Sequence, residues 1–390
     1  MRKARIMWGV WLLIMAVLLI FTNNYGIQII ALLSVILPSA GIVFGFLGSG
    51  KLKVDVKGQI SQKKGCPLTY SIQVKNEGRI GCSKGKAIIK LENMLTGENE
   101  KQETAFSIRG RQAKVFECSH VFQNCGKIRI TLEEIQSWDF IGAYGRKNKT
   151  HSVTNALSIP DTFHIELSMG AGAQTDLSSD EYSMLKSGFD PSETFALREY
   201  RPGDKIKNIH WKLSEKLDEI TVRELGLPVN NSVLLMLDSS YPAENSKPEH
   251  EVMDAIGETV ISIAQELCDN GVPFQVAWYD SEASTTQVRE IMNIDDLSSA
   301  MSGVLSATPF EDGSSVLSHF KEDAGPLEYA HIIIVGSVQE PQMESSFCEG
   351  FVSNLICMKN EKPSDIAAAA GQIIYFTPET MAEDLYYVEV

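Results

Sequence analysis

Basic residues are scarce in the second part of this sequence. Residues 228–390 contain 5 Lys and Arg against 27 Asp and Glu, whereas residues 1–227 contain 30 against 23, and the whole chain carries a net charge of −15. Proteins hold nucleic-acid phosphates with Lys and Arg, so this scarcity excludes nucleic acid as a partner of the acidic part. The acidic charge fits a basic protein partner, or it serves solubility.

Closely spaced cysteines and common catalytic motifs are also absent. The chain has 7 cysteines, at positions 66, 82, 118, 125, 268, 348 and 357, an odd number without a C-x-x-C pair. This pattern is typical of reduced thiols and speaks against zinc, because zinc sites use closer pairs. The sequence also lacks H-E-x-x-H, G-x-S-x-G and a G-x-G-x-x-G in a βαβ setting.

Ionisable residues are missing from two apolar runs, Ile6–Thr22 and Ile27–Gly48. An apolar helix needs about 20 residues to cross a bilayer. We therefore predict that residues 1–50 form two transmembrane helices, at 6–22 and 27–48. A cleaved signal peptide is the alternative for the first run, but no small-x-small site follows it and the second run begins at once.

The flanks of these runs predict their orientation. Arg2, Lys3 and Arg5 precede the first run, and Lys51 and Lys53 follow the second. The positive-inside rule then places both ends in the cytoplasm. The expected localisation is the cell membrane, multi-pass, with the N-terminus and the soluble domains cytoplasmic.

Residues 51–150 are predicted to form an all-β, immunoglobulin-like sandwich. Runs such as Leu68–Val74, Ala87–Leu91, Lys114–Cys118 and Lys127–Leu132 alternate with period two between turn residues. The module carries 19 Lys and Arg against 10 Asp and Glu. Such a charge would attract anionic membrane lipid, although a solvated basic surface explains it equally well.

Residues 151–194 are mostly polar and are predicted to be a linker or long loop. Residues 195–390 are predicted to hold a signature segment and an α/β domain with a parallel sheet, because strand and helix patterns alternate there. Val252, Ile256, Val260, Ile263 and Leu267 mark an amphipathic helix that Gly271 ends. The expected strands are Val233–Leu237, Phe274–Trp278, His331–Val335, Leu355–Met358 and Ile373–Phe376. Further helices are expected at Asp295–Leu305, Ser314–Lys321, Met343–Val352 and Ser364–Ala370.

The segment before the first of these strands has an unusual composition. It contains Arg198-Glu199-Tyr200-Arg201-Pro202-Gly203-Asp204, then Ile209-His210-Trp211-Lys212-Leu213-Ser214, then Val222-Arg223-Glu224. This pattern resembles bacterial membrane proteins known as the domain of unknown function 58 family. The resemblance covers nearly the whole chain and implies two membrane helices, a small β domain and a von Willebrand A-like (Rossmann-type) α/β domain. Residues 137–142 match the family's Asp-Pro-Phe-Gly-Leu segment only loosely, because the proline is absent.

The family resemblance also implies partners. Its members are often encoded beside MoxR-type AAA+ ATPases and transglutaminase-like membrane proteins. It therefore implies a membrane-anchored scaffold or adaptor and not an enzyme of known substrate. The first candidate for the protein that it binds is a MoxR-type ATPase.

The resemblance to a von Willebrand A-like domain also implies a candidate metal site. Asp238 and Ser240 match the first two positions of its Asp-x-Ser-x-Ser motif, and Thr308 could supply the later threonine. Hard oxygen ligands of this kind suit Mg²⁺. Pro242 replaces the second serine and cannot ligate, and Gly336-Ser337 stands where the family tends to have Asp-Gly. The alternative, which we favour, is a strand end without metal in which Asp238 caps local backbone amides, so no cofactor is expected.

Seven residues, which we call the signature residues, are candidates for partner binding. They are Arg198, Tyr200, Arg201, Asp204, His210, Trp211 and Lys212. With Lys205 and Lys207 they would form a basic strip on an acidic domain. The alternative is an envelope-associated hydrolase that uses the Arg198–Lys212 cluster with Asp238, since a histidine beside charged residues suits acid–base chemistry. No nucleophile or second carboxylate stands at a spacing that completes such a site, so we predict a binding role.

Overall fold

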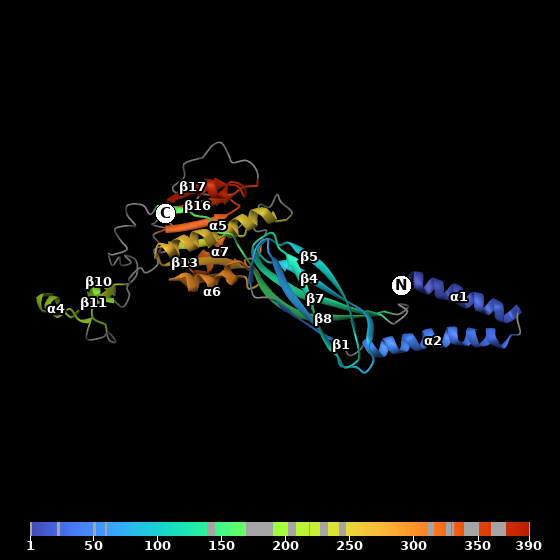
Figure 1. Ribbon diagram of the computed structural model, residues 1–390. Helices are drawn as coiled ribbons and strands as arrows, with labels where there is room; N and C mark the ends of the chain where they lie inside the picture. The colour runs from blue at the N-terminus through green and yellow to red at the C-terminus, as the bar shows by residue number, and fades with distance from the viewer. Residues whose placement is uncertain are drawn as a thin grey trace. The chain divides into compact units, whose positions relative to one another are not determined.

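The computed structural model of the 390-residue chain describes most of its length. The described residues are 2–21, 24–49, 52–58, 61–138, 145–168, 190–201, 208–217, 219–226, 233–241, 247–310, 316–324, 329, 331–338, 351–359 and 372–389. The chain divides into two compact units, Met1–Pro160 and Asp161–Val390. Figure 1 labels helices and strands of both units.

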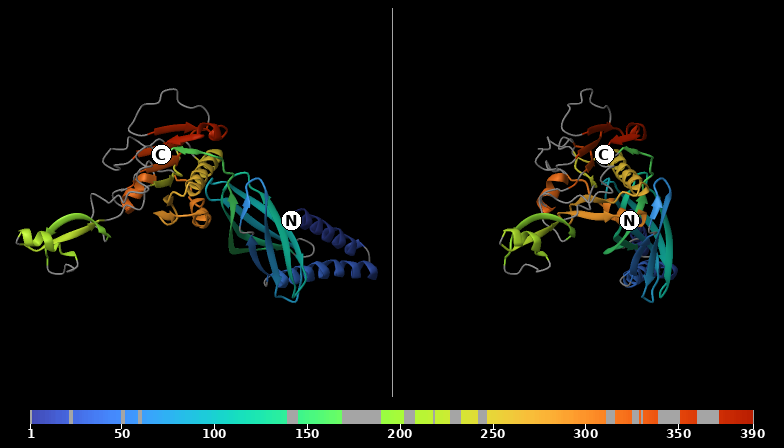
Figure 2. Two further views of the ribbon diagram at one scale, coloured as in Figure 1. Left: turned by 60° about the vertical axis from the view of Figure 1, so that its left-hand side comes forward. Right: turned by 90° about the vertical axis from the view of Figure 1, so that its left-hand side faces the viewer.

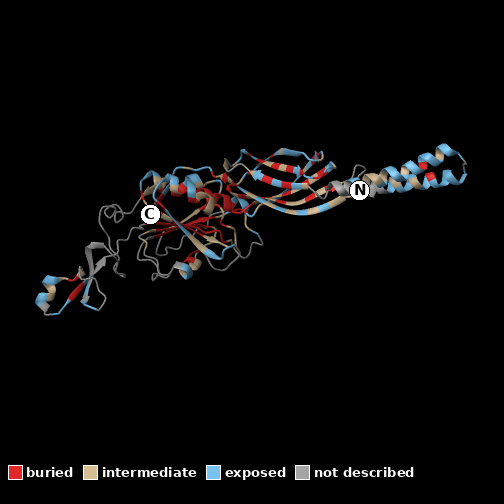
Figure 3. Ribbon diagram, turned by 90° about the horizontal axis from the view of Figure 1, so that it is seen from below, coloured by how far each residue is buried: buried red, intermediate tan, exposed pale blue. Residues whose placement is uncertain are grey.

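The first unit begins with two helices, α1 (Arg2–Phe21) and α2 (Tyr25–Ser49). They contact each other, and the Trp8 indole N–H donates to the Ser34 carbonyl at 3.4 Å. Asn24 precedes α2, and its side-chain oxygen accepts from the Gly26 N–H at 2.8 Å. Most apolar side chains of the pair are exposed, as the pale blue colour in Figure 3 shows.

The expectation of two transmembrane helices is corrected by this structure. Within the described residues, no helix combines the length and the apolar character that a membrane crossing requires. The expected multi-pass placement in the cell membrane, with cytoplasmic soluble domains, loses its support with it.

A two-sheet sandwich follows the helices (Figure 2). One sheet has the order β1-β3-β6 and the other the order β2-β8-β7-β4-β5. Their bounds are β1 Leu52–Gly58, β2 Ser61–Lys63, β3 Pro67–Asn76, β4 Cys82–Asn93, β5 Asn99–Ile108, β6 Ala113–Val121, β7 Gly126–Trp138 and β8 Gly145–Ile159. Alternate residues of both sheets, such as Ile72, Ile89 and Ile130, meet in one buried core, as expected for strands with one face turned inward.

The period-two runs predicted for this module are confirmed as parts of β3, β4, β6 and β7. The structure differs at the end of the module, because β8 pairs with β7 as far as Ser158. The sandwich therefore extends past residue 150, and the first part of the expected 151–194 linker is strand. Of the family-like segment 137–142, only Ser137 and Trp138 are described.

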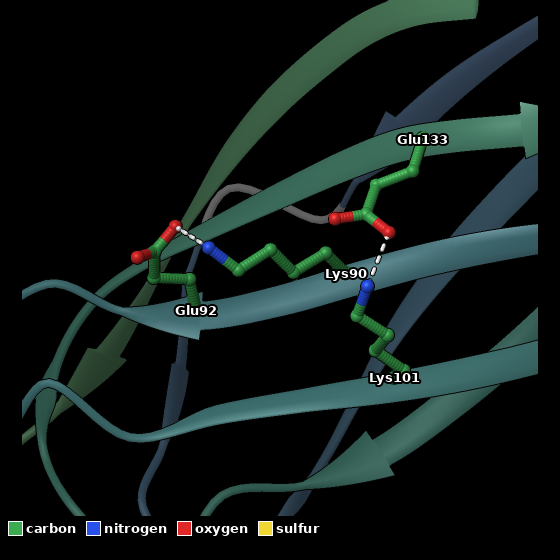
Figure 4. Close-up of polar contacts among 4 residues, drawn as sticks. All are labelled: Lys90, Glu92, Lys101 and Glu133. Carbon is green, nitrogen blue, oxygen red and sulfur yellow. Dashed lines mark hydrogen bonds and ion pairs between the residues drawn. The ribbon is translucent and has the colours of Figure 1, made fainter. Parts of the chain in front are cut away.

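Charged side chains cover the outer face of the five-stranded sheet. Lys90 on β4 and Lys101 on β5 are cross-strand neighbours, and like charges at such positions repel each other. Figure 4 shows how each charge is balanced: Lys90 pairs with Glu92 at 2.9 Å, and Lys101 pairs with Glu133 on β7 at 2.7 Å. Two of the basic side chains of the module are thus paired with its own acidic side chains.

The second unit contains a six-stranded sheet, which we call the α/β sheet, in the order β14-β13-β12-β15-β16-β17. Its strands are β12 Val233–Leu237, β13 Phe274–Asp280, β14 Thr285–Ile291, β15 His331–Gly336, β16 Phe351–Cys357 and β17 Gln372–Phe376. All neighbours are parallel except the edge strand β14. Numbered along the chain the order is 3-2-1-4-5-6, the doubly wound order, whose direction reverses between β12 and β15.

Helices cover both faces of this sheet. On one face α7 (Val316–Ala324) packs Phe320 against Leu234 and Met236 of β12. Alternation directs Leu235 and Leu237 to the other face, where α5 (His250–Asp269) contacts β12 and α6 (Ile294–Val304). All of β12 is buried, which explains its continuous apolar sequence.

The strands and helices expected from the sequence are largely present here. The five predicted strands and the helices at α5, α6 and α7 are confirmed, with bounds shifted by a few residues. Asn270 forms the C-cap of α5, and Gly271 follows with a φ of 70°, a conformation that glycine adopts without strain. Most of the expected helix Met343–Val352 and all of Ser364–Ala370 lie outside the described residues, and the end of the former is strand β16.

Residues 161–168, which we call the strap, lie along α5. The Asp161 N–H donates to Glu258 at 3.1 Å and the Phe163 N–H donates to Ser262 at 3.2 Å, and His164 contacts Glu266 at 3.2 Å. The strap ends in β9 (Glu166–Ser168), which pairs in parallel with β18 (Tyr387–Glu389) after the short helix α8 (Met381–Asp384). The expected linker is therefore ordered structure up to residue 168, and residues 169–189 lie outside the described part.

A small motif precedes the α/β sheet in the chain. The strands β10 (Asp190–Glu199) and β11 (Thr221–Gly226) form a two-stranded antiparallel sheet, and α4 (Trp211–Leu217) lies between them in sequence. These strands are separate from the six-stranded sheet. The described part of residues 195–390 thus contains the β10–β11–α4 motif, the α/β sheet, and the end segment with α8 and β18.

Candidate functional site

The first candidate site lies where β12 ends, at the point where the strand order reverses. The N–H of Asp238 donates to the Val335 carbonyl of β15 at 2.8 Å, which continues the strand pairing by one residue. Asp238, Ser239 and Ser240 are each at most 2 % exposed. A doubly wound sheet offers its ligand-binding crevice at this reversal, outside the carboxyl ends of the strands.

Asp238 is held by its own loop and by a glycine of the neighbouring strand. Its Oδ1 accepts from the Ser240 N–H at 2.9 Å, a local turn that aspartate often forms. A Cβ placed on Gly336 of β15 would lie 2.9 Å from the Asp238 Cβ. The carboxylate thus occupies a space that only a glycine at position 336 leaves open.

The segment that contains Thr308 lies beside this loop. Ser239 Oγ donates to the Thr308 carbonyl at 3.1 Å, and Ser240 forms a parallel bridge with Phe310. On the other side, Ser337 Oγ donates to the Ser240 carbonyl at 2.8 Å. The structure therefore brings the segments of all three predicted metal ligands, Asp238, Ser240 and Thr308, into one strand-end cluster.

The donor set of this cluster fits a magnesium ion poorly. The Thr308 hydroxyl is in close contact with Ser281 Oγ, and one oxygen of Asp238 is already bonded to Ser240. Ser240 Oγ is buried without a hydrogen-bond partner, so of the two hydroxyls it is the one left available. No cluster of three His, Cys, Asp or Glu that could hold a metal occurs among the described residues, whereas Mg²⁺ usually takes one or two carboxylates in a near-octahedral shell.

Sequence reasoning missed an aromatic group next to this cluster. Tyr279 at the end of β13 stacks on His319 of α7, with ring centroids 4.1 Å apart, and Phe310 packs edge-on against both. Nothing in the spacing of these three residues could have revealed the group, because they come from three separate elements. It closes the strand ends on the α7 side of the sheet.

The second candidate site is the β10–β11–α4 motif, which carries most of the signature residues. Arg198 pairs with Val222 across the strands, and the Tyr200 N–H donates to the Ile220 carbonyl at 2.8 Å. Ile209 and Val222 are buried, at 8 % and 2 % exposed. The Arg198 side chain and all of Asp204, Lys205 and Lys207 lie outside the described residues.

His210 stabilises the start of α4. Its Nδ1 accepts from the Leu213 N–H at 3.2 Å, and its carbonyl accepts from Ser214 Oγ at 3.1 Å. Ser214 Oγ in turn accepts from the Thr221 N–H of β11 at 2.9 Å. The His210 N–H also donates to the Thr221 carbonyl at 2.8 Å, so the histidine joins the helix to the strand.

The remaining signature residues face outward. Trp211 is 63 % exposed and Tyr200 is 37 % exposed, and Arg201 and Lys212 are exposed as well. Figure 3 shows α4 in pale blue and tan beside buried residues of the motif. We call the exposed side chains of Tyr200, Arg201, Trp211 and Lys212 the docking face.

Comparisons with known proteins place few constraints on this chain. No protein-family model matches it, and no curated protein matches it. A solved structure of the CARDB domain of the PF1109 protein from Pyrococcus furiosus is similar at 19% identity over 28% of this chain and 94% of that chain, with a TM-score of 0.22. A β-glucosidase from Listeria innocua is similar at 10% identity over 27% of this chain and 16% of that one, with a TM-score of 0.21.

These similarities are too weak to carry an argument about function. The structural neighbours do not show a von Willebrand A fold, and at these TM-scores they carry no argument about the fold of residues 195–390. That part of the chain is described by its observed topology: the β10–β11–α4 motif and the doubly wound α/β sheet, with β18 paired to β9 of the strap.

Proposed function

We propose that this protein is a non-enzymatic adaptor that binds another protein through the docking face of the β10–β11–α4 motif. The single observation that carries the proposal is the exposure of Trp211. A tryptophan that is 63 % exposed on a short helix leaves a large apolar surface in water, and that surface is stabilised when a partner covers it.

The neighbours of Trp211 support the same role. Binding energy at protein interfaces concentrates in Trp, Tyr and Arg, and the docking face combines Trp211, Tyr200 and Arg201. Its aromatic residues extend from a hydrogen-bonded framework, since His210 and Ser214 tie α4 to β11. A framework of this kind lowers the entropy lost on binding.

The charge of the docking face indicates what its partner presents. Arg201 and Lys212 are cationic and exposed, so the matching surface carries acidic residues around an apolar pocket. The resemblance to the domain of unknown function 58 family makes a MoxR-type AAA+ ATPase the first candidate, and a transglutaminase-like protein the second.

The alternative, a hydrolase, requires an additional role for one of the same residues. A hydrolase built on the Arg198–Lys212 cluster would need His210 to exchange protons with a substrate. The contact between the Leu213 N–H and His210 Nδ1 already uses one ring nitrogen for capping, which favours the binding role.

The test measures binding of the full chain to a purified MoxR-type ATPase, with and without ATP. We expect Trp211→Ala to weaken binding by about 2 kcal/mol, or about 30-fold in Kd, the typical loss at an interface hot spot. Lys212→Glu should weaken binding most at low salt. Lys84→Glu, which makes the same charge change at an exposed lysine of β4, is the matched control and should stay within about twofold.

Two results would contradict the proposal. If the wild-type chain binds no ATPase in either nucleotide state, the named partner is wrong. If Trp211→Ala and Lys84→Glu bind alike while both melt cooperatively, the docking face is not the contact.

A further inference from the structure

A pocket of about 160 Å³ opens at the strand ends of the α/β sheet. Ser337 after β15 and Met358 after β16 line it, together with Tyr241 after β12 and Glu249 just before α5. The pocket lies at the carboxyl side of these strands, where α/β sheets most often bind ligands. It is separate from the docking face, and the inference below does not depend on the proposed function.

The walls of the pocket are apolar and adaptable. Val252, Met253 and Cys357 are 5 %, 1 % and 1 % exposed, and Met358 joins them. Methionine side chains are unbranched and adjust to different shapes. A protein cavity of about 150 Å³ accepts a molecule the size of benzene, so this pocket accommodates one long side chain and not a nucleotide cofactor.

A carboxylate stands at the pocket with an exchangeable partner. Glu249 is paired with Lys359 at 3.2 Å, and the two side chains are 29 % and 54 % exposed. Such a surface ion pair contributes about 0–1 kcal/mol, so another cation can replace the lysine. The pKa of the buried Cys357 thiol is raised to about 12, first by burial and then by the Glu249 charge, so this charge is felt at the pocket floor.

The surroundings attract cations to this carboxylate. Residues 228–390 carry 27 acidic against 5 basic side chains, and a field of one sign raises the local concentration of oppositely charged ligands. The pocket thus combines an apolar wall with a carboxylate that lies in a negative field.

We propose that this pocket binds an arginine side chain from a basic segment of a partner protein. The aliphatic part of the arginine packs on Val252, Met253 and Met358, and its guanidinium takes the place of Lys359 on Glu249. Arginine fits better than lysine, because its planar fork binds a carboxylate with two hydrogen bonds and gives up its hydration more readily.

The test uses the full chain labelled with ¹³C at the methionine methyl groups. The probe is the capped peptide Gly-Gly-Arg-Gly-Gly, with lysine and citrulline versions as matched controls. We expect saturable shifts of the Met253 and Met358 methyl signals with the arginine peptide, and none at Met301 on α6. Met253→Leu and Met358→Leu assign the two signals. Citrulline has the shape of arginine without its charge and should bind at least tenfold more weakly.

Variants separate the carboxylate from general charge. Glu249→Gln should weaken the arginine peptide at least tenfold, whereas Lys359→Ala should strengthen it several-fold because the competing cation is gone. Glu251→Gln removes an exposed acid from the first turn of the same helix and should leave the affinity within twofold. An unchanged methionine spectrum of each free variant shows that the fold is intact.

The proposal is overturned by any of three results. These are an absence of saturable shifts at Met253 and Met358, equal binding of the arginine and citrulline peptides, or equal losses in Glu249→Gln and Glu251→Gln. Equal binding of the lysine and arginine peptides would refute the preference for a guanidinium.

Discussion

Gly336→Ala tests whether the end of β12 depends on a close approach between two strands. The added Cβ would lie 2.9 Å from the Asp238 Cβ and 3.4 Å from its Cγ. Neither strand can yield easily, because Asp238 is 1 % exposed and its N–H is bonded to the Val335 carbonyl at 2.8 Å. We therefore expect the substitution to strain the strand-end cluster.

The expected loss follows from two opposing effects. Overpacking a dense core costs about 1–3 kcal/mol, whereas replacing glycine with alanine restricts the unfolded chain and returns about 0.4–1 kcal/mol. The net loss is about 1–2 kcal/mol. For a unit the size of Asp161–Val390 this corresponds to a fall in Tm of about 2–8 °C.

Differential scanning calorimetry of the full chain measures this loss. The transition that moves must be that of the Asp161–Val390 unit. Gly58→Ala is the matched control, since its Cβ would meet nothing nearer than Thr154 Cγ2 at 3.4 Å, and it should leave Tm unchanged or slightly higher. A Gly336→Ala protein that melts at or above the wild-type temperature would refute the reasoning.

Three further predictions concern the second unit. Glu258→Ala removes the acceptor of the Asp161 N–H; the unfolding free energy should fall by about 1–3 kcal/mol, and hydrogen exchange should accelerate at Asp161 more than at Phe163, whose N–H keeps Ser262. Burial raises the pKa of the Cys357 thiol to about 12, so iodoacetamide at pH 8.5 should modify the exposed Cys66 and spare Cys357. Equal alkylation of Cys66 and Cys357 would contradict the protection of Cys357. The unfolded thiol ionises at about pH 8.5 and loses its proton before the folded thiol does, so the unfolding free energy should fall as pH rises above that value. Burial lowers the pKa of His331, so the unfolded ring binds a proton first as pH falls below about 6.5; urea unfolding at pH 7 and pH 5 should show a smaller loss in His331→Gln than in the wild type.

Local patterns in the sequence predicted the elements that carry strong periodicity. The alternation in Leu68–Val74 and the apolar run Val233–Leu237 are strands, and the three-and-four spacing from Val252 to Leu267 is helix α5. These patterns are reliable because each one arises from an element that buries one face or its whole length.

Elements whose stabilising contacts are distant in the chain were not predicted. The strand β5 has a mostly exposed, polar sequence, and β9 and β18 pair across more than 200 residues. The membrane expectation failed because uncharged composition alone does not establish a spanning helix in the described residues. Long-range pairing leaves no local periodicity to read.

The candidate sites show the same division. The sequence placed Asp238 at a strand end, and the resemblance to a von Willebrand A-like domain suggested Thr308 as its companion. It gave no sign of the pocket at Glu249 and Lys359, which are 110 positions apart. It also could not show that His210 caps α4, since the partner is a backbone N–H.

The strap has a consequence for how the α/β sheet can be isolated. Glu258 and Ser262 lie on a face of α5 that is otherwise enclosed, and their partners are backbone groups of residues 161–163. A fragment that begins at Val233 would expose this stripe and leave β18 without β9. Proteolytic trimming or recombinant expression should therefore yield a stable fragment only if it starts at or before Asp161.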